Sequence, residues 1–125
     1  MKLIVTATAP DIDAAVDPRF GRGAYFIEID TETGQWHAHE NQAVNASGGA
    51  GSQAAQAVVR QGAGAVVSGD FGPNAHLVLA AADVRMYLLG TSKTPREAAA
   101  ALAAGSLPEV SGPTSPGHHG GRGGQ

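Results

Sequence analysis

The chain has 125 residues, no cysteine and a formal net charge of -3 at pH 7, and only 15% of its residues are charged. This length suits one domain with a single core. The charges are spread along the chain, so the grouped lysines and arginines of a nucleic-acid-binding surface are missing. The lack of cysteine excludes disulfides, thiolate-held zinc and cysteine-ligated iron–sulfur clusters, so any metal must be held by oxygen, nitrogen or its own sulfide ligands.

The first segment, KLIVTAT at residues 2–8, is rich in β-branched side chains and predicts a strand buried on both faces, which Pro10 ends. The apolar residues 3–9 are too few to span a bilayer, and Asp11 and Asp13 follow where a secretory signal would need more apolar length. We therefore expect a soluble, cytoplasmic protein with no membrane partner.

A loop and a hairpin come next. Residues 11–23, DIDAAVDPRFGRG, follow neither the helical nor the strand period, which predicts a long loop of the functional kind. Residues 24–30 and 35–40 alternate as strands do, and the turn TETG joins them. His37 and His39 share one face of the second strand; they could form a two-nitrogen metal site, but the polar face of an exposed hairpin is the simpler interpretation.

Residues 41–52, NQAVNASGGAGS, join this hairpin to a helical pattern at residues 53–61. The glycines in it that could take left-handed conformations or approach a ligand closely are Gly48, Gly49 and Gly51, and its N-cap types are Asn45, Ser47 and Ser52. A helix start with bare amides attracts anions. The segment therefore predicts an anion-binding loop, and a tight connection that merely needs glycine fits it equally well.

The second half alternates strands and helices. AVVS at residues 65–68 predicts a buried strand, Gly72 and Pro73 open a second helix, and RMYLL at residues 85–89 predicts the last strand. A capping box at residues 94–97 then starts a third helix, which stops at Gly105. The predicted order is βββαβαβα.

This order places the loops. If the first three strands form an antiparallel meander, right-handed crossovers make the first, third, fourth and fifth strands parallel. Their carboxyl ends then meet at one edge of the sheet, with the loops at residues 9–23, 41–52, 69–74 and 90–94. Open α/β sheets bind ligands at such an edge.

Three segments together resemble the dinitrogenase iron-molybdenum cofactor-binding family, which includes NifX, NafY, the C-terminal part of NifB and the orange protein of sulfate reducers. They are DPRFGRG at residues 17–23, the glycine-rich segment, and GDFGPNAHLVLAAADVRMYLL at residues 69–89, and the resemblance extends from residue 2 to about 104. It implies a ribonuclease H-like α/β fold with a mixed five-stranded sheet flanked by helices. It also implies non-catalytic binding, carriage or assembly of an anionic metal–sulfur cluster, of the molybdenum–iron or molybdenum–copper sulfide type.

The chain departs from the family pattern twice. Several nitrogenase-associated relatives have histidine where this chain has Arg19, so charge pairing is expected here in place of a covalent nitrogen ligand. Asp83 stands at a helix-to-strand turn where relatives usually have glycine, and we give it only structural meaning.

Arg19 and Arg22 are the leading candidates for binding, because a guanidinium offers several donors to sulfide or oxo groups and stays charged. They could instead be solvated loop charges that balance Asp11, Asp13 and Asp17, although the motif match favours the ligand role.

Three further candidates have competing interpretations. Phe20 either shields a cluster from water or plugs the core. Asn74 could donate its amide to an anion at the start of the second helix, and His76 could ligate a metal, although a lone histidine on a helix is more often structural. The predicted cofactor-binding residues are Arg19, Phe20, Gly21, Arg22, Asn45, Ser47, Gly48, Gly49, Gly51, Asn74 and His76.

From Ser106 onward, glycine and proline dominate and too little apolar surface is available to offset the entropy of ordering. We therefore expect a domain at residues 1–105 and a flexible tail at residues 106–125. In that tail His118 and His119 could weakly capture copper, nickel or zinc, and a solvated tail explains them at least as well.

A cluster carrier, with a cluster-accepting protein as a further partner, is the leading function. The alternative enzyme is a ribonuclease H-like hydrolase or phosphotransferase with magnesium held by Asp11, Asp13, Asp17 and Asp70. Two-metal chemistry needs carboxylates on rigid elements, and these lie in predicted loops, so it ranks lower. A regulatory module that binds a protein through the hairpin is the third interpretation.

Overall fold

The computed structural model describes residues 1–44 and 48–112. Within these residues the chain forms five strands and three helices in the predicted order βββαβαβα. They are β1 (Lys2–Ala7), β2 (Tyr25–Asp30), β3 (Trp36–Glu40), α1 (Ala50–Arg60), β4 (Ala65–Ser68), α2 (Pro73–Ala81), β5 (Arg85–Leu88) and α3 (Pro95–Ala103). None of these helices has the length and apolar character needed to cross a membrane.

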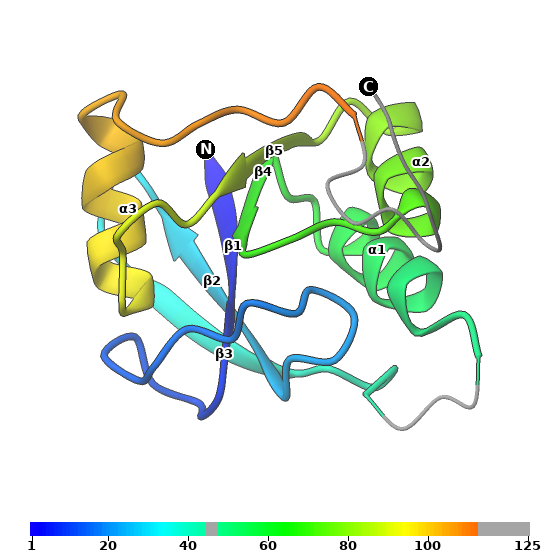
Figure 1. The fold of residues 1–125 in the computed structure, drawn as a ribbon. Coiled ribbons are helices and arrows are strands. Elements are labelled where there is room, and N and C mark those ends of the chain that lie inside the picture. The colour runs from blue at the N-terminus through cyan, green and yellow to red at the C-terminus, as the bar shows by residue number, and fades with distance from the viewer. Residues whose placement is uncertain (45–47, 113–125) are drawn as a thin grey trace.

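The strands form one mixed sheet in the order β3-β2-β1-β4-β5 (Figure 1). β2 is antiparallel to both β1 and β3, whereas β4 is parallel to β1 and to β5. The predicted meander and parallel crossovers are thereby confirmed, and β1, β3, β4 and β5 end at the same edge. The wider ribonuclease H-like label stays a prediction.

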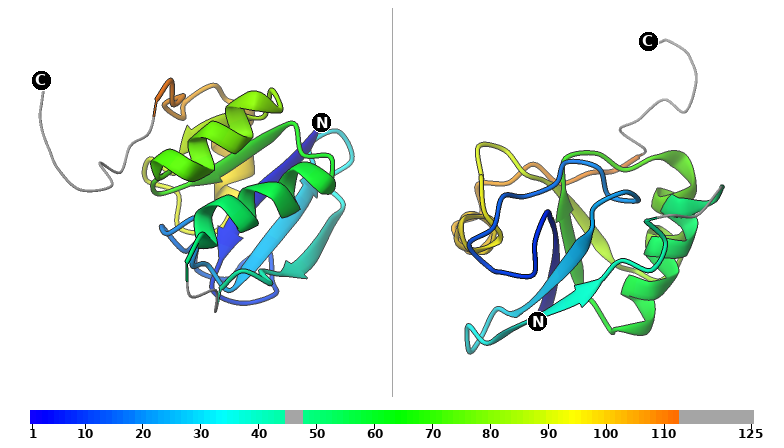
Figure 2. Two further views of the ribbon diagram at one scale, coloured as in Figure 1. Left: turned by 90° about the vertical axis from the view of Figure 1, so that its right-hand side faces the viewer. Right: turned by 90° about the horizontal axis from the view of Figure 1, so that it is seen from below.

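The sheet has a helical layer on each side. α1 and α2 lie side by side over one face, and α3 covers the other together with the loop after β1 (Figure 2). Alternate residues of β1 feed the two cores: Ile4 packs under α1 and α2, while Leu3 and Val5 pack on the side of α3, and all three are fully buried. This confirms that β1 is buried on both faces.

The helix starts differ in how they are made. α3 begins as predicted, because the Thr94 hydroxyl accepts the N–H of Glu97 at 3.1 Å. The expectation for α1 was wrong: it begins at Ala50, so Ser52 lies inside the helix and does not cap it. Gly49 is the N-cap, and its φ of 72° takes the chain into the helix without any side-chain hydrogen bond.

Fewer glycines at the start of α1 adopt left-handed conformations than the sequence predicted. Gly49 adopts one, but Gly48 and Gly51 do not have positive φ. Asp83 does, with a φ of 59°, which explains structurally why glycine suits this turn.

The residues just after Gly105 make contacts that their composition did not predict. Leu88 donates its N–H to the carbonyl of Pro108 at 2.9 Å, and Val110 donates to the carbonyl of Met86 at 2.8 Å. Val110 also packs against the core under α1 and α2. This short segment therefore pairs with β5 at the edge of the sheet, while the division of the chain at residue 105 stays a prediction.

Candidate functional site

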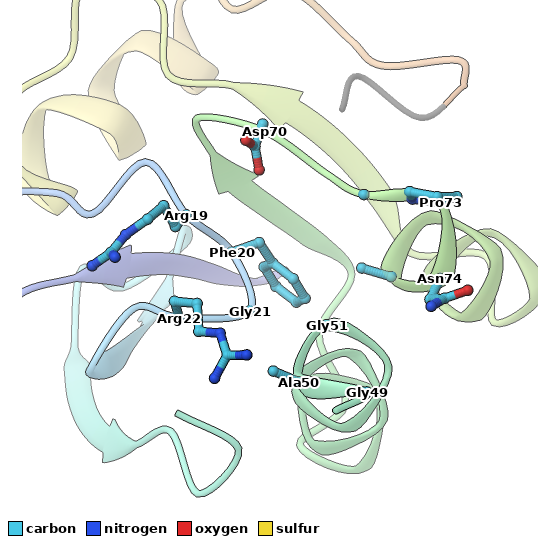
Figure 3. Close-up of a pocket in the computed structure, with 12 residues that line it drawn as sticks. Arg19, Phe20, Gly21, Arg22, Gly49, Ala50, Gly51, Asp70, Pro73 and Asn74 are labelled. Atoms are coloured by element: carbon cyan, nitrogen blue, oxygen red, sulfur yellow. The ribbon is translucent and has the colours of Figure 1, made fainter. Parts of the chain in front are cut away.

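A cavity of about 380 Å³ lies at the carboxyl edge of the sheet, between the loop after β1, the start of α1 and the β4–α2 connection (Figure 3). The predicted site residues that line it are Arg19, Phe20, Gly21, Arg22, Gly49, Gly51 and Asn74. Ala50, Asp70, Gly72, Pro73 and Ala75 complete the lining. The structure thus brings residues 17–23 and the glycine-rich segment together, as the topology predicted.

The walls of the cavity touch through backbone. A Cβ atom on Gly21 would lie 2.9 Å from both the Cα and the N of Gly51, and one on Gly69 would lie 2.5 Å from the Cβ of Pro18. Asp70 also donates its N–H to the carbonyl of Pro18 at 2.9 Å. These glycines are therefore required by close packing between loops.

Two buried hydroxyls hold the loop after β1 from below. Thr6 and Ser68 are fully buried at the ends of β1 and β4, and their hydroxyl oxygens are 3.0 Å apart. Thr6 donates to the carbonyl of Asp17, and Ser68 donates to the carbonyl of Pro18 at 3.4 Å. We missed both residues in the sequence, where the only signal was a hydroxyl ending an apolar run.

Asn41 supports the same loop from the other side. Its side chain is 3% exposed, and its amide donates to the carbonyls of Gly21 and Gly23 at 3.1 and 2.8 Å. Its oxygen accepts the N–H of Ala43 at 3.0 Å. Asn41, which lies in the predicted binding segment, therefore holds the backbone of the loop at residues 17–23 by hydrogen bonds.

Phe20 belongs to the core as well as to the cavity. It is 2% exposed, and its ring centroid lies 5.8 Å from that of Phe26 and 5.6 Å from that of Phe71. Its packing agrees with the interpretation that Phe20 fills the core. Phe20 also lines the cavity.

Arg19 is committed to Asp17. Its Nε and Nη2 atoms each lie 3.2 Å from a carboxylate oxygen of Asp17, and its backbone N–H donates to the same carboxylate at 2.9 Å. Figure 3 shows the guanidinium turned away from Gly51 and Asn74. In this state Arg19 balances Asp17, as the alternative interpretation proposed.

The pair with Arg19 also sets the pKa of Asp17. Burial is the largest influence and acts to raise the pKa of this carboxyl, whose side chain is 7% exposed. The hydrogen bonds and charge of Arg19 together outweigh burial, so the pKa of Asp17 lies below its ordinary value. Asp17 is therefore held as a carboxylate.

Arg22 lies differently. Its Nη1 donates to the carbonyl of Val44 at 2.9 Å, and Figure 3 shows the side chain extending toward Ala50 at the start of α1. It is exposed and lines the cavity. Its charge therefore lies on the same side of the cavity as the first turn of α1.

The two helices that reach the cavity both start at glycine. Gly49 precedes α1 and Gly72 precedes α2, and neither N-cap supplies a side-chain hydrogen bond, unlike Thr94 at the start of α3. The first N–H groups of a helix have no acceptor within it, and the helix dipole adds positive potential there. We therefore expect both helix starts to provide backbone N–H donors to the cavity. Pro73, at the start of α2, is the exception because proline has no N–H.

Several predicted residues lie elsewhere. Gly48 and His76 are outside the cavity lining. Asn45, Ser47, His118 and His119 fall outside the described residues. In the hairpin, His39 pairs with Glu28 at 2.9 Å between Nε2 and Oε1.

No group of three or more histidines and carboxylates that could hold a metal ion occurs in residues 1–44 and 48–112. The four aspartates of the alternative enzyme accordingly do not form a magnesium site. Asp13 pairs with Arg96 at 2.8 Å, and Asp17 with Arg19.

Comparison with known proteins agrees with this arrangement. The family described as "Dinitrogenase iron-molybdenum cofactor" matches residues 1–105. The apo form of the orange protein from Desulfovibrio gigas is 36% identical over 91% of this chain and 96% of its own, with a TM-score of 0.87. A putative NifB protein from Thermotoga is 29% identical over 98% of both chains, with a TM-score of 0.75. No curated protein matches the chain. With nearly all of its described residues matched, the chain belongs to the dinitrogenase iron-molybdenum cofactor family.

Proposed function

We propose that the protein binds and carries an anionic metal–sulfur cluster in the cavity, without catalysing a reaction. The observation that carries this proposal is the meeting of two glycine-started helices and Arg22 around one hollow of about 380 Å³. Backbone donors at helix starts bind anions without a lysine or a thiolate, which suits a chain with no cysteine.

The mode of binding would be hydrogen-bonded and electrostatic. Each charge-assisted hydrogen bond contributes on the order of 1.5 to 3 kcal/mol, so several are needed to retain a cluster. Arg22 supplies the guanidinium charge nearest α1, whereas Arg19 contributes only if it leaves Asp17. Retention should weaken as ionic strength rises.

The cluster class rests on the family and its relatives. The family is described by the iron-molybdenum cofactor and one similar structure is a putative NifB protein, which supports a molybdenum–iron sulfide. The molybdenum–copper sulfide type, which the sequence resemblance also implies, is the second cluster to test. A protein that accepts the cluster would be the natural partner.

Anaerobic reconstitution tests the proposal. Protein is mixed with tetrathiomolybdate and either cuprous or ferrous ions, desalted, and measured by visible absorption and metal analysis. We expect stoichiometric molybdenum and new visible bands, with clear loss of both in Arg22→Ala. Arg60→Ala is the matched control, because Arg60 lies in the last turn of α1, away from the cavity. Wild-type protein that keeps no molybdenum after desalting would refute the proposal.

A further inference from the structure

One lining residue runs against a simple anion site. Asp70 lies in the β4–α2 connection and is exposed, and it places a carboxylate in the wall of the cavity. Figure 3 shows this carboxylate directed from the connection toward Phe20. A cavity built only to attract anions would not carry it, because like charges repel.

Asp70 takes part in none of the ion pairs found among the residues that the structure describes. The ion pairs in this part of the chain join other residues, and Arg19, whose backbone bridges that of Asp70, is engaged by Asp17. The backbone of Asp70 is fixed, because its N–H donates to Pro18 at 2.9 Å. This contact holds the backbone of Asp70 beside the loop after β1, at the wall of the cavity.

Asp70 and Arg22 give the cavity two different walls. Arg22 and the start of α1 offer positive charge and N–H donors, while Asp70 offers a negative oxygen ligand. A bare oxyanion such as molybdate or sulfate carries negative charge over its whole surface, so it is repelled wherever it meets Asp70. A metal–sulfur cluster presents anionic sulfides and metal ions at separate points of its surface, and carboxylates are metal ligands.

We propose that Asp70 is the specificity-determining residue of the cavity. It excludes bare oxyanions and favours an anion that turns a metal ion toward the β4–α2 wall. Only the preference for an anion with an exposed metal ion rests on the proposed function. The exclusion of oxyanions is a property of the protein without a cluster.

The substitution Asp70→Asn tests the exclusion. Asparagine keeps the shape of the side chain, and the backbone contact to Pro18 does not involve that side chain. Molybdate and sulfate are titrated separately into nitrogen-15-labelled protein, and the amide shifts of Ala50, Gly51 and Asn74 report binding at the helix starts. We expect Asp70→Asn to bind each oxyanion about ten-fold more tightly than wild type.

Two variants control for charge and shape. Asp83→Asn makes the same chemical change at the far end of α2, where asparagine also tolerates the positive φ, and should leave oxyanion binding near the wild-type value. Asp70→Glu keeps the charge and should still exclude oxyanions. Equal oxyanion affinity in wild type and Asp70→Asn, or an equal gain in Asp83→Asn, overturns the exclusion.

The metal-facing half is tested with the reconstituted protein. We expect Asp70→Asn to lose molybdenum and its partner metal several-fold faster than wild type during dialysis, despite its tighter binding of oxyanions. Equal or slower loss overturns this half. If wild-type protein takes up no cluster at all, the proposed function fails, and the oxyanion titrations still decide whether Asp70 filters the cavity.

Discussion

The contact between Gly21 and Gly51 makes a prediction whose sign depends on which of the two glycines is changed. In Gly21→Ala the new methyl group would lie 2.9 Å from two backbone atoms of Gly51, about 0.5 Å inside ordinary contact, which begins near 3.4 Å. Those atoms belong to the first turn of α1 and cannot rotate away. Overpacking of this kind lowers the free energy of unfolding by about 1 to 3 kcal/mol.

The reciprocal variant has room. A Cβ on Gly51 would meet the Cβ of Ala75 at 3.6 Å, an ordinary contact, and Gly51 does not have a positive φ. Alanine in place of glycine in a helix stabilises by up to about 1 kcal/mol. We therefore expect Gly51→Ala to unfold at or above the wild-type temperature.

Thermal and urea unfolding of both variants measure the difference. Each kcal/mol shifts the melting temperature of a domain near this size by roughly 4 °C or more, so the two variants should separate clearly. If Gly21→Ala unfolds at the wild-type temperature, the backbone contact does not explain why glycine stands there. If Gly51→Ala falls as far as Gly21→Ala, the two walls are not arranged as described.

Substitutions at three other positions have definite expected signs. Asp83→Gly should raise the free energy of unfolding by up to about 1 kcal/mol, because glycine relieves a positive φ of 59°, whereas Asp83→Ala should not. Thr6→Val should lower it by about 1 to 3 kcal/mol, since it strips a fully buried hydroxyl from the carbonyl of Asp17, and Thr6→Ser should recover much of the loss. Because Arg19 keeps the pKa of Asp17 low, their pair stabilises the fold above the ordinary aspartate pKa and loses this effect as pH falls below it. The stability gap between wild type and Arg19→Ala in urea should therefore narrow below about pH 4, and a gap that widens there would contradict the sign.

The fold followed from the sequence where local pattern and topology rules agree. Short apolar runs, the alternation of the hairpin and the glycine or proline at each helix boundary were enough for the order βββαβαβα. The right-handed crossover rule then placed the loops at one edge, and the cavity lies there. Neither step needed side-chain detail.

The prediction for the start of α1 was wrong, and the contacts of the residues after Gly105 were missed, for the same reason. Backbone interactions determine both regions, and the pattern of side chains in a sequence does not reveal them. The start of α1 was misplaced because Gly49 turns the chain without a capping side chain. The pairing of Pro108 and Val110 with β5 uses main-chain groups that any sequence offers. The composition of the tail therefore did not reveal it.

Asp70 shows the same limit at the site. In the sequence it stands only as one of four possible magnesium ligands, because nothing in residues 69–72 indicates which way its carboxylate points. Its place in the cavity depends on β4 pairing beside β1 and on the Pro18 contact, both long-range features. The arginines were easier to find, yet their different orientations also had to come from the structure.

Four of the twelve residues that line the cavity are glycines, and this limits how the cavity can discriminate among ligands. Glycines at positions 21, 49, 51 and 72 leave parts of its walls without side chains, so a bound anion would meet the backbone of the helix starts, whose N–H donors have a fixed chemistry. Backbone donors of this kind favour any anion that fits. Selection among anions must then come from the few side chains that remain, and of the charged ones Arg19 is engaged by Asp17 while Arg22 is attractive to all anions. Asp70 is the charged lining residue whose effect differs between a uniformly negative ion and a cluster with exposed metal, so the specificity of the site depends on it more than on the arginines of the recognisable motif.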